Sequence, residues 1–370
     1  MAAPRDKFGR PIVVVTGMGI VTSLGAGKAD NWAKLTAGES GIKTVTRFPI
    51  DGLKSTMAGA IDFVTVEPFS STGLSERLAE MVTNEAIEQS GIGSKGDFPG
   101  PLFLAVAPVE TEWPQRLEIG RTVGLTLGKT EMDYFDILRA SGGGQFAEFH
   151  HRFMFGSVAN YLARTFGTKG SPISLSTACA SGATAIQLGV EAIRRGEADA
   201  ALCIGTDGSV NPEALVRFSL LSALSTQNDP PQAASKPFSK NRDGFVMAEG
   251  AGAMVLESYE SATARGATIL GVVAGCGELT DSFHRTRSSP DGKPIIGCMR
   301  KTLADAGLEP EQIDHITRTA PRRRKTTRWN TTPPPWCSVI ICRRSRCRRT
   351  SRWSGTRFQP PARSRQCSRC

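Results

Sequence analysis

Runs of apolar residues separated by polar, glycine-rich turns divide most of the chain into strands and helices. The runs "PIVVVTGMGIVTSLG" (11–25) and "PLFLAVAP" (101–108) are bounded by glycine or proline and predict buried strands. Apolar residues at helical spacing predict helices over 31–37, 75–89 and 156–167, the last ended by a glycine. The first part of the chain therefore has the pattern of an α/β protein.

The same alternation continues after residue 170. "SPISLST" predicts a strand, "ACASG" a tight turn, and "ATAIQLGVEAIRRG" (183–196) an amphipathic helix. Later patterns predict strands at 199–208, 251–260, 267–279 and 313–316 and a helix at 294–308. We expect an α/β fold with a largely parallel sheet that helices cover on both faces. Residues 109–157 are charged and aromatic and contain "SGGG", which indicates an insertion or cap over the sheet.

The periodic pattern stops after Ile316, and the charge changes at the same point. The chain of 370 residues has a net charge of +10, but residues 317–370 contain 15 Arg, one Lys and neither Asp nor Glu. Residues 1–316 therefore carry a net charge of −6. The basic character belongs to the tail and is not a property of the α/β part.

Cysteine usage also differs between the two parts. Four cysteines are scattered over the α/β part, at positions 179, 203, 276 and 298, and five lie in the tail. Scattered cysteines favour a reducing compartment over a disulfide framework. The N-terminal apolar run has no signal-peptide pattern, and no run reaches the length of a membrane span. We expect a cytoplasmic protein that does not contact a membrane.

Cys179 is the candidate nucleophile because it lies between a predicted strand and a predicted helix start. Amide groups at a helix N-terminus stabilise the thiolate, which is the reactive form of cysteine. The small neighbours Ala178, Ala180 and Gly182 allow a sharp turn and the close approach of a substrate. A buried structural cysteine is the alternative interpretation. Cys203 and Cys276 lie in apolar runs, and we expect both in the core.

Three separated segments resemble the β-ketoacyl–acyl-carrier-protein synthases, most closely the synthase II type. They are "VVVTGMGIVTSLG", "STACASGATAIQLGVEAIRRGEADAALCIGTDG" and "ALSTQNDPPQAASKPFSKNRDGFVMAEGAGAMVLE". The resemblance runs from about Ile12 to Ile316 and is weakest over 109–150. It implies a thiolase-like fold of five layers, αβαβα, in which the first half is complete and the second half is truncated. The expected parts are 1–258 for the N-terminal half with its cap at 109–157, 259–316 for the start of the C-terminal half, and 317–370 for a non-family basic tail without ordered structure.

The resemblance also implies a reaction. Cys179 would take an acyl chain as a thioester, malonyl-acyl carrier protein would lose carbon dioxide, and the resulting carbanion would attack the thioester in fatty-acid elongation. The family needs neither a metal nor an organic cofactor. The implied partners are acyl carrier protein carrying acyl and malonyl groups and a second copy of the chain in a homodimer, and neither nucleic acid nor a membrane is expected.

Two histidine motifs of the family, "AHGT" and "NKSMxGH", are missing from this sequence. The four histidines of the chain are His150, His151, His284 and His315. His284 resembles a family loop near the active-site entrance, where a substrate-binding role or an ordinary loop position is possible. His150 and His151 lie in the cap, where a surface pair is preferred to a metal site, and His315 precedes the first missing motif. Phe245 and Glu249 match a family loop close to the site, and we expect them to support structure.

A lost base after the codon of Ile316 explains both the tail and the missing motifs. Restoring an A, with permitted third bases, converts "TRTAPRRRKTTRWNT" into "NAHGTATPENDKMEY". The same shift allows "NKSMVGH" further on, so that the two histidines overlap the codons of Thr319 and Thr356. The chain is therefore interpreted as a frameshifted condensing enzyme that is impaired or inactive as written. The alternatives are a non-catalytic remnant that pairs with an intact paralogue and a basic-tailed nucleic-acid-binding protein.

Overall fold

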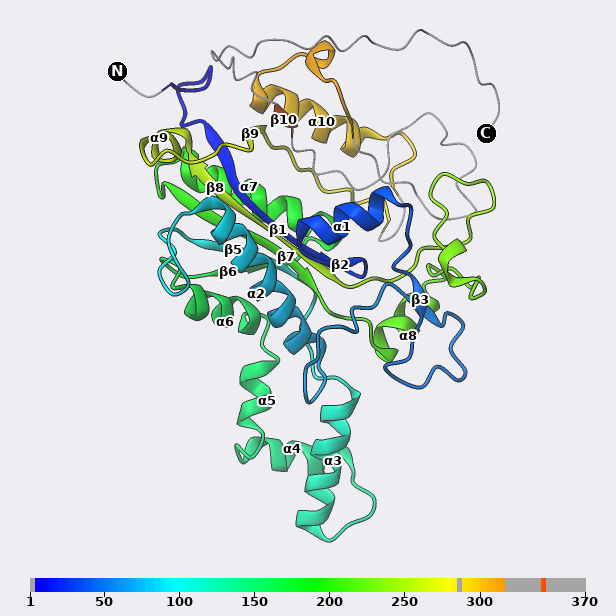
Figure 1. Cartoon of the computed structure of the whole chain (residues 1–370). Helices are drawn as coiled ribbons and strands as arrows, with labels where there is room; N and C mark the ends of the chain where they lie inside the picture. Colours follow the sequence, from blue (N-terminus) through cyan, green and yellow to red (C-terminus); the bar gives the residue numbers. More distant parts are fainter. Residues whose placement is uncertain (1–3, 285–287, 317–340, 344–370) are drawn as a thin grey trace.

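A computed structural model describes residues 4–284, 288–316 and 341–343 (Figure 1). Within these residues, one main sheet has the strand order β10-β9-β1-β8-β7-β5-β6, and β2 pairs with β1. Its strands are β1 (Val13–Thr22), β2 (Gly25–Ala26), β5 (Leu102–Val106), β6 (Ile173–Leu175), β7 (Ala200–Asp207), β8 (Gly250–Ser258), β9 (Gly271–Gly275) and β10 (Ile341–Arg343). A small second sheet joins β3 (Lys43–Thr44) to β4 (Met57–Ala58).

The main sheet is mixed, so the prediction of a largely parallel sheet is wrong. Only β5 pairs in parallel, with β6 on one side and β7 on the other. The pairs β7–β8, β8–β1, β1–β9 and β9–β10 are antiparallel. Alternation of helix and strand in the sequence does not fix strand direction here, because β8 enters between β7 and β1 and runs against both.

Helices cover both faces of the sheet, as predicted. The helices are α1 (Gly27–Thr36), α2 (Ser71–Ser90), α6 (Ser157–Phe166), α7 (Ser181–Arg194), α8 (Pro212–Leu220), α9 (Tyr259–Ala264) and α10 (Lys293–Ala306). Along β5, Leu104 faces the core with α2 and α6, whereas Phe103 and Ala105 face the core with α7. This period of two buries both faces of the strand and explains its unbroken apolar run.

The contact between β1 and α2 depends on two glycines. A Cβ atom at Gly17 would lie 2.0 Å from the carbonyl oxygen of Ala86, and one at Gly19 would lie 1.9 Å from that of Val82. Any side chain at these positions would separate the helix from the sheet. The two glycines of "VVVTGMG" therefore allow the backbone of β1 to approach the backbone of α2.

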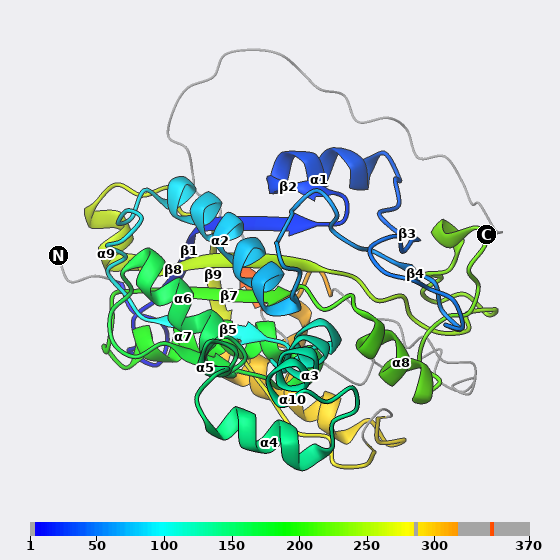
Figure 2. The ribbon, with the colours of Figure 1, turned by 90° about the horizontal axis from the view of Figure 1, so that it is seen from below.

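The segment 109–157 forms three helices that project from one end of the sheet (Figure 1). They are α3 (Trp113–Leu127), α4 (Tyr134–Gly142) and α5 (Ala147–Arg152). Figure 2 views the molecule along this projection and shows α3 nearly end-on. Asp133 caps α4 reciprocally with Asp136, which ends the charged loop that precedes the helix. We call α3–α5 the cap.

The end of the α/β part differs from the sequence prediction. Residues 313–316 form no strand, because no ladder partner pairs with them in the described part of the chain. Ile341–Arg343 instead pair with β9, so the expectation of no order throughout the tail is wrong for these three residues. The rest of 317–370, including the codons of the missing histidine motifs, lies outside the described residues. Among the described helices, none is long and apolar enough to cross a membrane.

Candidate functional site

Cys179 lies at the junction of strand and helix that the sequence predicts. β6 ends at Leu175, a single 3₁₀ turn covers Ala178–Ala180, and α7 starts at Ser181. The Cys179 thiol is exposed, so the alternative of a buried structural cysteine does not apply. Ala178 has a φ of 54°, a left-handed conformation that costs an alanine about 1 kcal/mol. The chain therefore holds the residue before Cys179 in a strained conformation.

Side-chain hydroxyls hold this turn. The Ser181 hydroxyl accepts a hydrogen bond from the Thr177 amide at 2.8 Å and donates one to the Ala178 carbonyl at 2.6 Å. The Thr177 and Thr184 hydroxyls lie 2.9 Å apart and share a third hydrogen bond. These bonds connect the residues on both sides of Cys179 to the first turn of α7.

The start of α7 can stabilise negative charge near Cys179. Ala180 is the N-cap residue and has no side-chain oxygen with which to accept from the first amides of the helix. The first amides of a helix lack intrahelical partners and carry the positive end of the helix dipole. The turn therefore places an exposed thiol beside groups that favour a thiolate or an oxyanion.

The other cysteines are less accessible than Cys179. Cys203 is 2% exposed on β7, as predicted, and burial raises the pKa of its thiol. Cys298 is also buried, and its thiol donates to the Gly277 carbonyl at 3.0 Å. The prediction for Cys276 is only partly right, because its side chain contacts the core but is half-buried after the end of β9. Solvent exposure therefore distinguishes Cys179 from the other three.

The histidines lie on three different segments. His150 and His151 are neighbours on α5 of the cap, with ring centroids 5.6 Å apart, and His315 is exposed after α10. His284 is half-buried in the loop after β9. Within the described ranges, no group of three His, Cys, Asp or Glu residues could hold a metal ion. The substrate-binding role of His284 stays a prediction.

Glu249 supports structure, as expected. Its carboxylate accepts from the Arg47 guanidinium at 2.6 and 2.9 Å, from the Ile61 amide at 2.7 Å and from the Val210 amide at 3.1 Å. Burial raises the pKa of Glu249, and the guanidinium and the amides oppose that shift. Phe245 packs edge-on against Phe218 with ring centroids 5.4 Å apart. Both residues therefore stabilise the segment that leads into β8.

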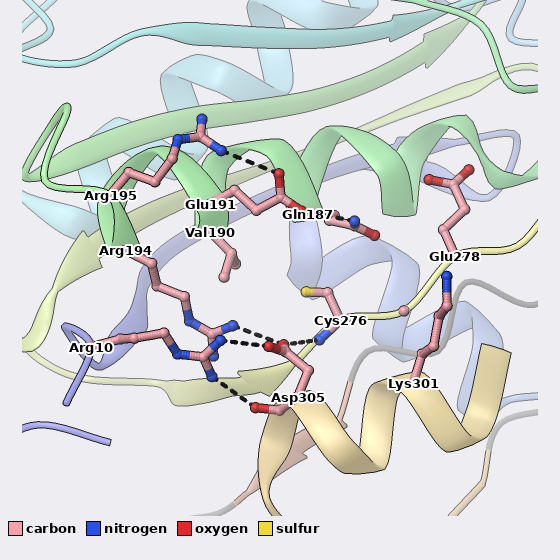
Figure 3. A pocket seen from close by; sticks show the side chains of 11 residues that line it. Arg10, Gln187, Val190, Glu191, Arg194, Arg195, Cys276, Glu278, Lys301 and Asp305 are labelled. Atoms are coloured by element: carbon pink, nitrogen blue, oxygen red, sulfur yellow. Dashed lines mark hydrogen bonds and ion pairs between the residues drawn. The ribbon is translucent and has the colours of Figure 1, made fainter. Parts of the chain in front are cut away.

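A cavity of about 410 Å³ between α7 and α10 is a feature that sequence reasoning missed (Figure 3). It lies along the later part of α7, away from the helix start that carries Cys179. Charged and amide side chains dominate its lining: Arg10, Gln187, Glu191, Arg194, Arg195, Glu278, Lys301 and Asp305. Such a lining cannot bury an acyl chain without stranding charges. Asp305 joins the walls, since its carboxylate accepts from Arg10 at 2.7 Å and from Arg194 at 2.8 Å.

Comparison with known proteins places these features in a family. The family model "Beta-ketoacyl synthase, N-terminal domain" matches residues 10–262. The "3-oxoacyl-[acyl-carrier-protein] synthase 2" of Coxiella burnetii is 33% identical over 317 residues, which cover 82% of this chain and 72% of that protein. The enzyme of the same name from Vibrio cholerae is 33% identical over 310 residues, with the same coverage of both chains.

Solved structures agree with the sequence relatives. A type II polyketide ketosynthase, in complex with its acyl-carrier protein and bound to the hexaketide, superposes with a TM-score of 0.70 at 29% identity. The match covers 85% of this chain and 74% of that one. A β-ketoacyl synthase from Burkholderia phymatum superposes with a TM-score of 0.65 at 27% identity over 82% of this chain and 72% of that one. The fold is thus thiolase-like with a truncated second half, and the chain belongs to the β-ketoacyl synthase family of condensing enzymes.

Proposed function

We propose that the gene encodes a β-ketoacyl-acyl-carrier-protein synthase of fatty-acid elongation and that Cys179 is its acyl acceptor. The observation that carries this proposal is the exposed thiol on a strained, hydrogen-bonded turn at the start of α7. Relatives named 3-oxoacyl-[acyl-carrier-protein] synthase 2 and a ketosynthase in complex with its acyl-carrier protein support the substrate class. A relative named as a tetracenomycin polyketide ketosynthase subunit, 31% identical, marks polyketide extension as the related chemistry.

The proposed reaction has two steps that balance without a cofactor. First, the Cys179 thiolate attacks the carbonyl of an acyl thioester, and the carrier-protein thiolate leaves and takes up a proton. Second, the carbon–carboxylate bond of malonyl-acyl carrier protein breaks, and its electron pair remains on carbon as CO₂ departs. That carbon attacks the Cys179 thioester, the carbon–sulfur bond breaks, and a 3-oxoacyl product leaves with two more carbons.

The 370-residue chain is proposed to perform the first step and to fail at the second. Acyl transfer needs the thiol and the positive start of α7, both of which are present. Decarboxylation develops negative charge on the malonyl thioester, which hydrogen-bond donors must stabilise. In the resembling family these donors are the two motif histidines, and the sequence contains neither motif.

The parts of the chain are proposed to be an N-terminal half at 1–258, the start of a C-terminal half at 259–316, and an out-of-frame tail at 317–370. The family match to an N-terminal domain ends at residue 262, which supports the first boundary. Sequencing the gene across the codons of His315 to Ala320 tests the last one. A missing base there supports the frameshift, and an intact frame rejects it.

An elongation assay tests the function itself. Acyl- and malonyl-acyl carrier protein are incubated with the 370-residue chain or with a chain in which the base is restored. We expect 3-oxoacyl product from the restored chain and little or none from the 370-residue chain. Turnover by the 370-residue chain would refute its impairment, whereas inactivity of both chains, if both are folded, would refute the assignment to elongation.

Assembly as a homodimer is also proposed, and the cap supports it. Trp113, Leu125, Tyr134 and Phe135 expose between 54% and 73% of their surface on α3 and α4. Clustered exposed apolar side chains on a folded protein favour contact with another protein surface. Light scattering of the wild type and of Phe135→Glu measures this: a dimer that the substitution dissociates is expected, and a monomeric wild type would contradict the proposal.

A further inference from the structure

The loop after β9 contacts the nucleophile turn through one carboxylate, that of Glu278. Figure 3 shows Glu278 reaching from this loop toward α7. Its Oε1 atom lies 2.9 Å from the Thr184 hydroxyl on the first turn of α7. The Thr184 hydroxyl in turn lies 2.9 Å from the Thr177 hydroxyl, two residues before Cys179. Glu278 is the charged end of this hydrogen-bonded chain.

The single proton of the Thr184 hydroxyl gives the chain a direction. That hydroxyl has two alternative acceptors, the Glu278 carboxylate at 2.9 Å and the Ala180 carbonyl at 3.2 Å. A carboxylate forms the stronger hydrogen bond, so Thr184 donates to Glu278. Thr184 then accepts from Thr177, whose hydroxyl becomes the donor. Without the carboxylate, Thr184 would donate back to the Ala180 carbonyl or to Thr177, and the order of the chain would be lost.

Glu278 itself is held by the packing of its loop on α10. A Cβ atom at Gly277 would lie 2.6 Å from the Thr302 hydroxyl and 2.7 Å from the Cys298 carbonyl, so this backbone touches the helix. One residue earlier, the Cys276 amide donates to Asp305 on α10 at 2.8 Å. The chain from α10 to the turn therefore starts from a fixed point.

We propose that Glu278 is a positioning residue that holds the strained turn of Cys179 through Thr184 and Thr177. It connects the start of the second half of the fold, at 259–316, to the nucleophile carried by the first half. The left-handed Ala178 needs such support, because the strain would otherwise relax. The inference deepens the proposed function and rests on it only for the chemistry that Cys179 performs.

The rate of Cys179 alkylation tests the inference without turnover. The 370-residue chain is treated with iodoacetamide at fixed pH, and adduct is quantified by mass spectrometry on the tryptic peptide Gly170–Arg194, in which Cys179 is the only cysteine. Glu278→Ala is expected to slow the rate about ten-fold. Glu278→Gln, whose amide oxygen still accepts from Thr184, should remain within about two-fold of wild type. This rescue separates positioning from a general loss of stability.

Two further variants complete the test. Thr184→Val removes the same chain and should slow alkylation as much as Glu278→Ala, with no additional loss in the double variant. Glu191→Ala removes a carboxylate that lines the same cavity and contacts Gln187 at 2.9 Å, and it should leave the rate unchanged. Folded Glu278→Ala with the wild-type rate, or additive effects in the double variant, would overturn the proposal. If Glu278→Ala does not fold, Thr184→Val compared with Thr184→Ser, which keeps the hydroxyl, decides the question in the same way. Failure of elongation with these alkylation results intact would refute the proposed function and leave the role of Glu278 standing.

Discussion

Replacement of Glu249 by alanine should remove the most heavily bonded carboxylate of the described fold that precedes β8. The Glu249 side chain has no solvent exposure and accepts four hydrogen bonds, two of them from Arg47. Glu249→Ala leaves the amides of Ile61 and Val210 without this acceptor. It also leaves the Arg47 guanidinium, 15% exposed, without its closest counter-charge.

The expected loss follows from these contacts. Removing one partner of a buried ion pair costs about 3–5 kcal/mol because the other charge stays buried. Arg47 keeps the Ile61 carbonyl at 2.9 Å and Asp62 at 3.2 Å, so part of its charge remains compensated. We therefore expect a loss near the lower end, about 3 kcal/mol. Glu249→Gln keeps a hydrogen-bond acceptor but loses the charge, and about 1–2 kcal/mol should be lost.

Urea unfolding followed by circular dichroism measures both losses as a change in the free energy of unfolding. Arg195→Ala is a matched control, since Arg195 and Glu197 form a pair whose side chains are 54% and 56% exposed. That control should cost less than about 1 kcal/mol. A Glu249→Ala chain within about 1 kcal/mol of wild type would refute the reasoning, because the buried pair would then contribute no more than an exposed one.

Three other predictions concern single residues. Burial raises the pKa of Glu76 to about 7 from 4.5, so the folded state binds this proton more tightly and stability should fall as pH rises through that interval. Glu76→Gln should therefore gain about 1–2 kcal/mol near pH 8 and nothing near pH 4 in urea titrations, allowing for partial solvent screening, and equal gains at both would contradict it. Gly19→Ala, with its Cβ 1.9 Å from the Val82 carbonyl oxygen, should cost about 3 kcal/mol in the same assay, while Gly142→Ala, which meets nothing within 4 Å, should cost little. Maleimide should leave Cys203 unmodified in the native chain and modify it in urea, and rapid native labelling would contradict its burial.

Much of the fold could be predicted because its signals are local. The buried runs of β1, β5 and β7 and the periodic helices α2, α7 and α10 lie within a few residues of their predicted bounds. Strand direction was predicted wrongly because it depends on which strands pair, and a run such as that of β8 carries no direction. The strand expected at 313–316 needed a partner that the local sequence does not reveal.

The candidate site divides in the same way. The position of Cys179 follows from its neighbours, since a strand, small residues and a helix occur in one short stretch. The contact of Glu278 with Thr184 joins residues 94 positions apart, and that of Asp305 with Arg10 joins residues 295 apart. No spacing rule in the sequence identifies such pairs. Only the packing of α10 and the β9 loop against α7 brings them together.

The central claim is that Cys179 accepts an acyl group, and the mass of one peptide tests it most directly. The 370-residue chain and the chain with the base restored are each incubated with acyl-acyl carrier protein, digested with trypsin, and compared with their Cys179→Ala variants. The account predicts one acyl group on the peptide Gly170–Arg194 in both parent chains and none in either variant. An acyl group that persists on Cys179→Ala, or no acyl group on the restored chain although Cys179 alkylates readily, would contradict it.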